Sequence, residues 1–178
     1  MTVRQIIIGA SCFACIGIGE QIAAAIYLSS KVTLTTPNAT FTTTNIVMSI
    51  AFVGVEPDKT IDWGDGTINP VVEGENTHIY TDEQPSHFVK VFTNATDFIT
   101  YGQQITSLDI SEMTELTGFG SMGNQLSSEN IDSILISLDE NGKLNGTANL
   151  TLNAGIRTSA SDAAVAKKKK KGWTLFLD

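Results

Sequence analysis

Residues 60–67, which read TIDWGDGT, constrain the fold of this chain more than any other segment. Ile61 and Trp63 alternate with polar residues, as large side chains do along a strand with one buried face. Gly64 and Gly66 supply the positive-φ positions that a tight hairpin needs. The segment therefore predicts a strand, a tight turn and a second strand.

The turn is followed by His78 and Tyr80, and then by residues 87–92, HFVKVF, as a further alternating strand. A WGDGT turn, a His-x-Tyr and such a strand, in this order, resemble the signature of PKD-type domains. These are small immunoglobulin-like β-sandwiches of extracellular and surface proteins. Thr-rich and β-branched segments before the turn predict two preceding strands. The resemblance implies a PKD-like sandwich over residues 31–94.

Asp62 and Asp65 lie three residues apart beside a glycine, so a cation site is one interpretation of this turn. The alternating oxygen donors and the downstream Glu of a calcium loop do not follow, which favours a structural turn. His78 could be a ligand or a base, but it has no Cys, His or Ser partner at a suggestive spacing, and we expect it to pack. We expect no catalytic residue, no metal and no cofactor. The residues of the structural motif are Trp63, Gly64, Asp65, Gly66, Thr67, His78, Tyr80 and Trp173.

The composition, with 42% hydrophobic and 17% charged residues, is typical of a globular chain of one ordinary domain or two small ones. Five of the eleven basic residues form the run 167–171, and the rest of the chain has six basic against nineteen acidic residues. Such a surface repels phosphate backbones, so nucleic acid is not an expected partner. The lysine run ends a helix predicted from Ser159 to about Lys169, where cations favour the helix dipole. We therefore expect the run to be solvated.

Residues 1–30 form an apolar N-terminal segment. Residues 6–19 carry no charge, but Glu20 interrupts the apolar stretch before the roughly 18–20 residues that a membrane span requires. A signal peptide is one interpretation, with Arg4 before the apolar run and alanines at 23–25 as a cleavage site. The alternative, which we expect, is a retained segment that is buried against another chain.

The sequence after residue 94 repeats with an offset of 21 residues, since residues 98–105 have the pattern F-x4-QQI and residues 119–126 have F-x4-NQL. Between them, residues 108–110 have the L-x-L pattern of a strand. The period, this strand and the Asn-Gln-Leu step resemble a leucine-rich repeat. Each turn of such a coil buries its apolar edge only against a neighbour, so a two-turn coil needs a cap on both sides.

Residues 126–178 resemble the end module of leucine-rich-repeat proteins found among Bacteroidetes surface proteins and phage or prophage tail proteins. Ser127 or Ser128 caps a predicted helix, the next strand is expected at 150–152, and the Gly-Trp step at 172–173 leads into the last strand. The closing helix of the family usually has a Leu shortly before its Lys-Gly-Trp, and here that place falls in the lysine run. We expect either a looser cap or lysine stems that cover apolar surface.

These patterns predict a fold that is mainly β with some α. An immunoglobulin-like, PKD-type sandwich (31–94) and a short capped leucine-rich-repeat coil (95–178) follow the N-terminal segment (1–30). Acidic pairs such as Asp139 and Glu140 are expected on solvent-facing turns. No constellation of nucleophile and base, metal spacing or phosphate loop stands out, so we do not expect an enzyme.

The resemblance implies a non-enzymatic structural or adhesive surface protein. We expect a bacteriophage virion component at the virion surface, attached to capsid or tail as a fibre or decoration. Its expected partners are other virion proteins through residues 1–30, a host surface glycan or protein, and further chains in a homo- or hetero-oligomer. The alternative is an extracellular, secreted or membrane-tethered bacterial surface protein that binds a glycan or a host protein.

Overall fold

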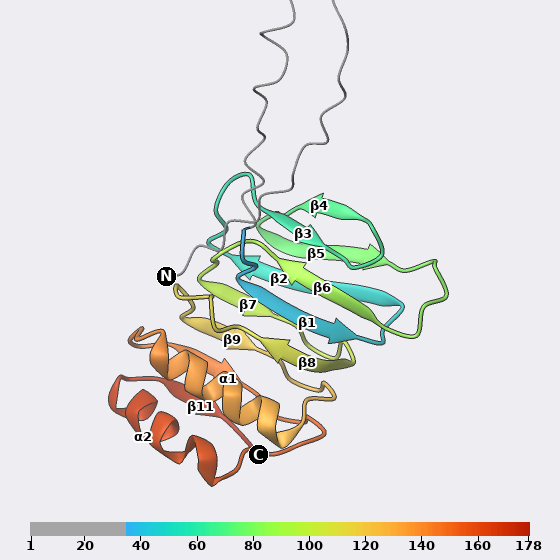
Figure 1. The fold of residues 1–178 in the computed structure, drawn as a ribbon. Helices are drawn as coiled ribbons and strands as arrows, with labels where there is room; N and C mark the ends of the chain where they lie inside the picture. The colour runs from blue at the N-terminus through green and yellow to red at the C-terminus, as the bar shows by residue number, and fades with distance from the viewer. Residues whose placement is uncertain (1–34) are drawn as a thin grey trace, which may run out of the picture. The chain divides into compact units, whose positions relative to one another are not determined.

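The computed structural model describes residues 35–178, and the predicted N-terminal segment 1–30 lies outside these described residues. The described chain forms eleven strands in two sheets, two short α-helices and one turn of 3-10 helix (Figure 1). The prediction of a mainly β fold with some α is therefore confirmed. The two sheets face each other across a common core, as in a β-sandwich.

Sheet A is antiparallel throughout. Its strand order is β4 (Ile68–Pro70), β3 (Thr60–Asp62), β6 (His87–Val91), β1 (Ala39–Thr43) and β8 (Ile105–Asp109). Alternate residues point into the core, and among them Ile61, Val89 and Phe41 are fully buried. On the outer side Asp62 lies opposite Lys90, with 3.0 Å between carboxylate and ammonium.

Sheet B combines antiparallel and parallel strands. Its order is β5 (Gly74–Ile79), β2 (Val47–Val53), β7 (Asp97–Ile99), β9 (Gly118–Gly120), β10 (Thr147–Asn149) and β11 (Thr174–Phe176). Strand β2 is antiparallel to both β5 and β7, whereas β7, β9, β10 and β11 are parallel. The predicted boundary at residues 94 and 95 falls between β6 and β7, yet β7 pairs directly with β2. The two predicted modules therefore share one sheet.

An aromatic cluster joins the two sheets at this boundary. Phe52 on β2 stacks on Phe98 on β7, with 5.0 Å between ring centroids. The ring of Phe41, from β1, lies 6.4 Å from Phe98, and that of Phe119, from β9, lies 6.2 Å from it. Fully burying one such side chain contributes about 1.5–3 kcal/mol, so the cluster couples the stability of the sandwich strands to that of the parallel strands.

The four parallel strands lie side by side in register, and side-chain amides connect the segments that carry them. We refer to this part of the chain as the coil. The Asn124 amide donates to the Thr100 carbonyl at 2.6 Å and accepts from the Gln103 backbone at 2.8 Å. Asn153 occupies the equivalent place one turn later and donates to the Ser121 carbonyl at 2.8 Å. The two predicted copies thus lie in adjacent turns, and a third copy follows at residues 147–155.

Two strand assignments made from the sequence are wrong. The L-x-L segment at residues 108–110 is not a strand of the coil, because β8 pairs with β1 in sheet A. Leu108 is buried there, and the Asn130 amide bonds both backbone groups of Leu108, at 2.8 and 2.7 Å. The strand expected at residues 150–152 is instead β10, and Leu152 lies in the following turn at φ 60° with 69% of its surface exposed.

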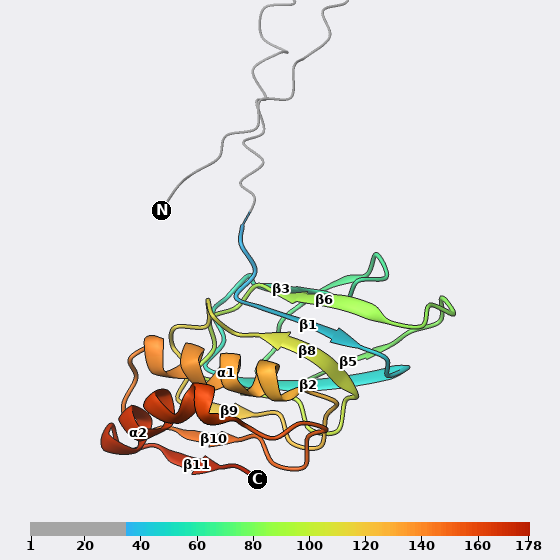
Figure 2. The same cartoon turned by 60° about the horizontal axis from the view of Figure 1, so that its bottom comes forward.

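The two helices lie on the side of sheet B that faces sheet A. Helix α1 (Ser128–Glu140) begins at the cap Ser127, whose hydroxyl accepts from the Asn130 backbone, and it contacts β8. Thr158 caps the short helix η1 (Ser159–Ser161), which leads into α2 (Asp162–Lys170). Figure 2 shows α1 and α2 continuing the layer of sheet A beyond β8. The other side of sheet B remains uncovered by any described element.

The lysine run is not fully solvated, which corrects the expectation from the sequence. Lys168 is completely buried, with its ammonium 4.0 Å from the ring centroid of Trp173. Lys167 and Lys171 bind Asp139 at 3.3 and 2.9 Å. Asp139 is in the last turn of α1 and is largely buried, so its predicted place on a solvent-facing turn is also wrong. The Lys168 stem covers apolar surface next to Trp173. This is one of the two outcomes expected where the Leu of the family is missing.

Candidate functional site

The WGDGT turn joins β3 to β4 and is held by its own backbone and by Asp65. The Trp63 amide donates to the Thr67 carbonyl at 3.0 Å, and the Asp65 carboxylate accepts from the Thr67 amide at 2.9 Å. Gly64 has φ 85°, and a Cβ there would lie 2.5 Å from the Phe88 carbonyl oxygen. Gly66, at φ 92°, has the second positive φ of the turn. Both glycines are required by backbone conformation, as predicted for a tight turn.

His78 ties this turn to β5. Its Nε2 lies 2.7 Å from the second oxygen of Asp65, and its ring stacks on Trp63 at 5.0 Å. Tyr80 meets the His78 ring edge-on at 4.7 Å, and its hydroxyl donates to the Trp63 carbonyl at 2.9 Å. Burial raises the pKa of Asp65, but hydrogen bonds from Thr67 and His78 outweigh it, so the pKa lies below its usual value.

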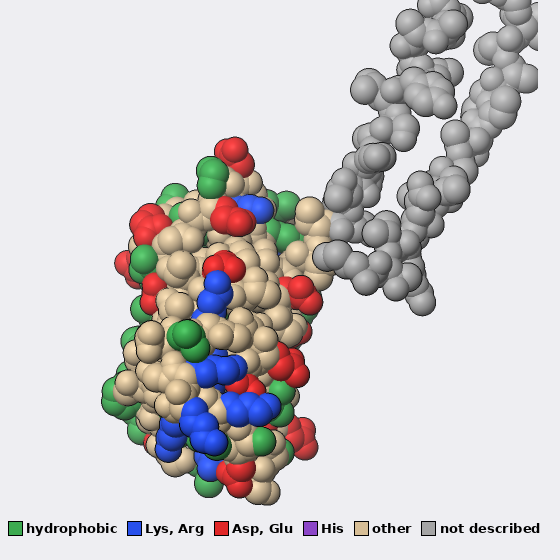
Figure 3. Space-filling view, turned by 90° about the vertical axis from the view of Figure 1, so that its left-hand side faces the viewer, with side chains coloured by type: hydrophobic (Ala, Val, Ile, Leu, Met, Phe, Trp, Pro, Cys, Tyr) green, Lys and Arg blue, Asp and Glu red, His purple; other side chains and the backbone are tan. Residues whose placement is uncertain are grey.

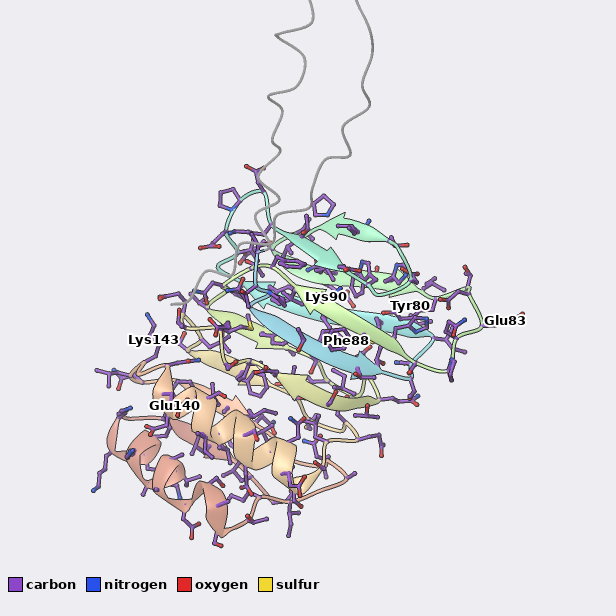
Figure 4. The ribbon with its side chains drawn as sticks, viewed as in Figure 1. Tyr80, Glu83, Phe88, Lys90, Glu140 and Lys143 are labelled. Carbon is purple, nitrogen blue, oxygen red and sulfur yellow. The ribbon has the colours of Figure 1, made fainter. Side chains whose placement is uncertain are left out.

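A second His–Asp pair, which the sequence did not predict, extends the aromatic stack. The His87 ring stacks on Tyr80 at 3.5 Å, and its Nε2 lies 2.8 Å from Asp82. The hydrogen bond from His87 holds the pKa of Asp82 below its usual value. Burial and the nearby carboxylates raise the pKa of Tyr80. Figure 4 places Tyr80 between the strands and Glu83 at the tip of the loop that follows.

Trp63, His78 and Tyr80, together with His87, form a packed cluster of stacked rings. Trp63, Tyr80 and His87 are buried, and the Trp63 indole donates to Asn69 at 2.7 Å. The Tyr80 hydroxyl donates to the Trp63 carbonyl, whereas the buried Nδ1 of His87 has no hydrogen-bond partner among the described residues. Trp173 does not belong to this cluster, because it packs at the end of the coil and donates to the Lys143 carbonyl at 2.8 Å.

Hollows and metal ligands offer no alternative site within residues 35–178. No group of three or more His, Cys, Asp or Glu side chains in this range could hold a metal ion. The two best-defined hollows are shallow, with volumes of about 200 and 390 Å³. The larger one lies between the end of β8 and α1. It is lined by Leu108, Asp109, Ile110, Ser111, Asn130, Ser133, Ile134 and Ser137. The Asp109 carboxylate accepts from the Ser111 backbone amide at 2.9 Å.

The outward side of sheet B is a further surface without an assigned role, and we call it the open face. It comprises the outward side chains of the six strands together with Tyr101, whose ring lies over Gly120. Its exposed apolar side chains are Val47, Val53, Ile79, Tyr101 and Phe176. Its polar side chains are Ser49, Glu75, Thr77, Asp97, Thr147, Asn149 and Thr174. The face runs without interruption from the sandwich strands onto the coil.

Two glycines flatten the middle of the open face. A Cβ on Gly120 would lie 2.5 Å from the Tyr101 ring, and a Cβ on Gly118 would collide with the Asp97 carboxylate. Neither glycine has a positive φ, so close approach rather than backbone conformation requires them. Tyr101 is packed against the sheet backbone on one side of its ring and is still 43% exposed.

Charges are distributed unevenly between the open face and the ends of the helices. The open face has the carboxylates of Glu75 and Asp97 but no Lys or Arg among its side chains. Basic side chains gather near the helices, where Figure 3 shows Lys and Arg beside acidic groups. Figure 4 shows Glu140 at the end of α1 and Lys143 just beyond it. Lys143 is paired there with Glu115. The open face would therefore not attract an acidic ligand.

No protein-family model, no curated protein and no solved structure matches this chain. Among the described helices, none is long and apolar enough to cross a membrane.

The open face was not predicted from the sequence, although a signal was present. Residues 46–53, IVMSIAFV, are apolar on both faces of a strand, which indicates either burial on both sides or an exposed apolar surface.

Proposed function

We propose that this protein is a non-enzymatic structural and adhesive surface protein that binds its target through the open face. The observation that carries this proposal is the open face itself. It extends over six strands, no described element covers it, and it exposes five large apolar side chains. Val47 and Ile79 lie opposite one another on β2 and β5, and Tyr101 and Phe176 add two exposed rings on the parallel strands. Exposed apolar side chains that adjoin on an uncovered face support an interaction site.

The finer fold assignment is part of the same proposal. We propose that the antiparallel part is a PKD-type sandwich, which is supported by the WGDGT turn, its contact with His78 and the hydrogen bond from the Tyr80 hydroxyl to the Trp63 carbonyl. We propose that the parallel part is a leucine-rich-repeat coil, which is supported by its in-register strands and the Asn124 and Asn153 amide bonds. Both architectures present surfaces on a rigid scaffold, which fits a display protein.

We further propose that the protein is attached to a bacteriophage capsid or tail and contacts other virion proteins through residues 1–30. The resemblance of the C-terminal module to phage tail proteins supports this placement. Mass spectrometry of purified particles, with antibody labelling by electron microscopy, tests it. The protein should be found at the particle surface at a fixed copy number. Its detection in the bacterial envelope of phage-free cells would instead support the alternative, a secreted or tethered bacterial surface protein.

Binding through the open face is tested separately, with whole cells of the host strain. The double variant Tyr101→Ala and Phe176→Ala removes two exposed rings from the open face, whereas Phe88→Ala removes an equally exposed ring from the outer side of sheet A. The double variant should lose cell binding, and Phe88→Ala should retain it. Equal binding by all three proteins would contradict the proposal.

A further inference from the structure

We infer that the coil half of the open face binds an extended, neutral, β-linked glycan, with the rings of Tyr101 and Phe176 as stacking platforms. This inference rests on the proposed function, because it names the class of ligand that the open face takes. The relevant surface lies on β7, β9, β10 and β11.

The spacing of the two rings is set by the register of the sheet. Gly120, Asn149 and Phe176 lie opposite one another on β9, β10 and β11. Tyr101 lies over Gly120, and Phe176 is two strands further along, which corresponds to about 10 Å at the usual strand separation. Two sugar rings of an extended β-linked chain span a similar length, so alternate sugars can each meet one aromatic ring.

The two rings are available for stacking. Tyr101 packs one side of its ring on the backbone at Gly120 and is 43% exposed, and Phe176 is 50% exposed. Fixing Tyr101 against the sheet lowers the entropy that is lost when a ligand binds. An aromatic ring offers the C–H face of a pyranose a large apolar contact, and the Tyr101 hydroxyl keeps a polar group at its edge.

Polar groups lie where the hydroxyls of such a chain would be. Asn149 lies between the two rings. Its Oδ1 accepts from the Thr151 amide and hydroxyl, at 3.1 and 2.8 Å, whereas its Nδ2 has the Met122 sulfur, at 3.8 Å, as its one partner among the described residues and can donate to a ligand. Thr147 and Thr174 form the neighbouring row with exposed side chains, and Asp97 lies at its end. These amide, hydroxyl and carboxylate groups can donate to and accept from sugar hydroxyls.

The same features favour a neutral glycan over other polymers. The open face has two carboxylates and no cation, so acidic sugars and nucleic acids would be repelled. A protein partner of standard size requires about 800 Å² on each side with an apolar, aromatic-rich centre. Here the two rings are separated by Gly120 and Asn149, and Asn149 contacts the partly buried Met122 side chain. This alternation of rings and polar groups fits sugars better than an apolar protein interface.

The test is calorimetric titration of the full chain with cellohexaose, xylohexaose and chitohexaose. At least one should bind, and Tyr101→Ala and Phe176→Ala should each weaken binding by about tenfold, equivalent to about 1.4 kcal/mol. Gly120→Ala should weaken binding as well, because its methyl group displaces the Tyr101 ring. Phe88→Ala is the matched control and should bind like the parent. Thermal unfolding of each variant verifies that it is folded.

Two outcomes would overturn the inference. One is that no hexasaccharide binds at millimolar concentration, and the other is that binding is lost in Phe88→Ala but not in the folded Tyr101 and Phe176 variants. If cell binding still depends on Tyr101 and Phe176 while no hexasaccharide binds, the proposed function stands and the ligand is a protein or another polymer. If cell binding is independent of both rings, the proposed function itself fails.

Discussion

The ammonium of Lys168 lies 4.0 Å from the centre of the Trp173 ring, and neither side chain is open to solvent. Within residues 35–178, the one hydrogen-bond partner of this ammonium is the Lys143 carbonyl, at 3.4 Å. A buried cation with so few partners is costly, because the ring and one long hydrogen bond replace its hydration. Burial, with a smaller contribution from Lys171, lowers the pKa of Lys168 to about 8.

The first prediction concerns the pH dependence of this contact. Because the folded pKa is lowered from 10.5 to about 8, the unfolded chain binds more protons between these values. The destabilisation from Lys168 is therefore complete below pH 8 and is relieved as the pH rises to 10.5. Lys168→Met should raise the free energy of unfolding at pH 7 and remove this rise with pH, measured by urea unfolding. Lys169→Met, at an exposed neighbour, is the control and should leave the pH dependence unchanged.

A second prediction concerns Leu152, which has φ 60° where the two preceding turns have Gly102 and Gly123 at φ 65° and 71°. A left-handed conformation costs a side-chain-bearing residue roughly 1–2 kcal/mol, and the greater unfolded-state entropy of glycine offsets part of this. Since Leu152 is largely exposed, Leu152→Gly should raise the free energy of unfolding by up to about 1 kcal/mol. Gly123→Leu should lower it. A loss of stability in Leu152→Gly would show that the side chain makes a stabilising contact.

A third prediction compares two residues of the WGDGT turn. Trp63→Ala should lower the free energy of unfolding by roughly 3–5 kcal/mol, because it leaves a cavity beneath His78 and Tyr80. Asp65→Asn keeps an acceptor for the Thr67 amide and loses only the charge next to His78, so it should cost about 1 kcal/mol. Chemical denaturation measures both values. If the two variants lost similar amounts of unfolding free energy, the charge of Asp65 would stabilise the turn as much as the packing of Trp63 does, and the prediction would be wrong.

A fourth prediction concerns acid. Asp132 is buried in α1 and accepts hydrogen bonds from the Thr158 amide at 3.0 Å and from the hydroxyls of Thr158 and Ser161. Although burial opposes them, these bonds hold its pKa below the usual 3.8. Its stabilising contribution is therefore present above pH 3.8 and is lost as the pH falls through the lower, folded pKa. Asp132→Asn should lower stability at pH 7 and reduce the loss on acidification, measured by denaturant unfolding at pH 7 and at pH 3.

Elements that are stabilised by residues close together in the chain could be predicted from local sequence patterns. The WGDGT turn needs only its own glycines and Asp65, and the start of α1 needs only Ser127 and the apolar residues that follow. Both could be predicted for this reason. The open face could not, because it depends on the register between strands from both predicted modules.

Partners distant in sequence explain the errors. Strand β8 was assigned to the coil because its L-x-L pattern is local, whereas its pairing with β1 involves residues more than 60 positions away. The third coil turn was missed because Ala148 and Gly155 replace the Phe and Leu of the repeat. Gly155 is required there, since a Cβ would lie 2.2 Å from the Ser128 amide nitrogen. Lys168 was expected in solvent because the five identical lysines of the run do not indicate which one packs against Trp173.

The most direct test of the central claim is hydroxyl-radical footprinting of the intact protein bound to host cells. Three exposed aromatic rings report on two surfaces: Tyr101 and Phe176 on the open face, and Phe88 on the outer side of sheet A. Binding through the open face predicts that oxidation of Tyr101 and Phe176 falls several-fold in the bound protein while that of Phe88 is unchanged. Protection of Phe88 with continued oxidation of Tyr101 and Phe176 would contradict the account.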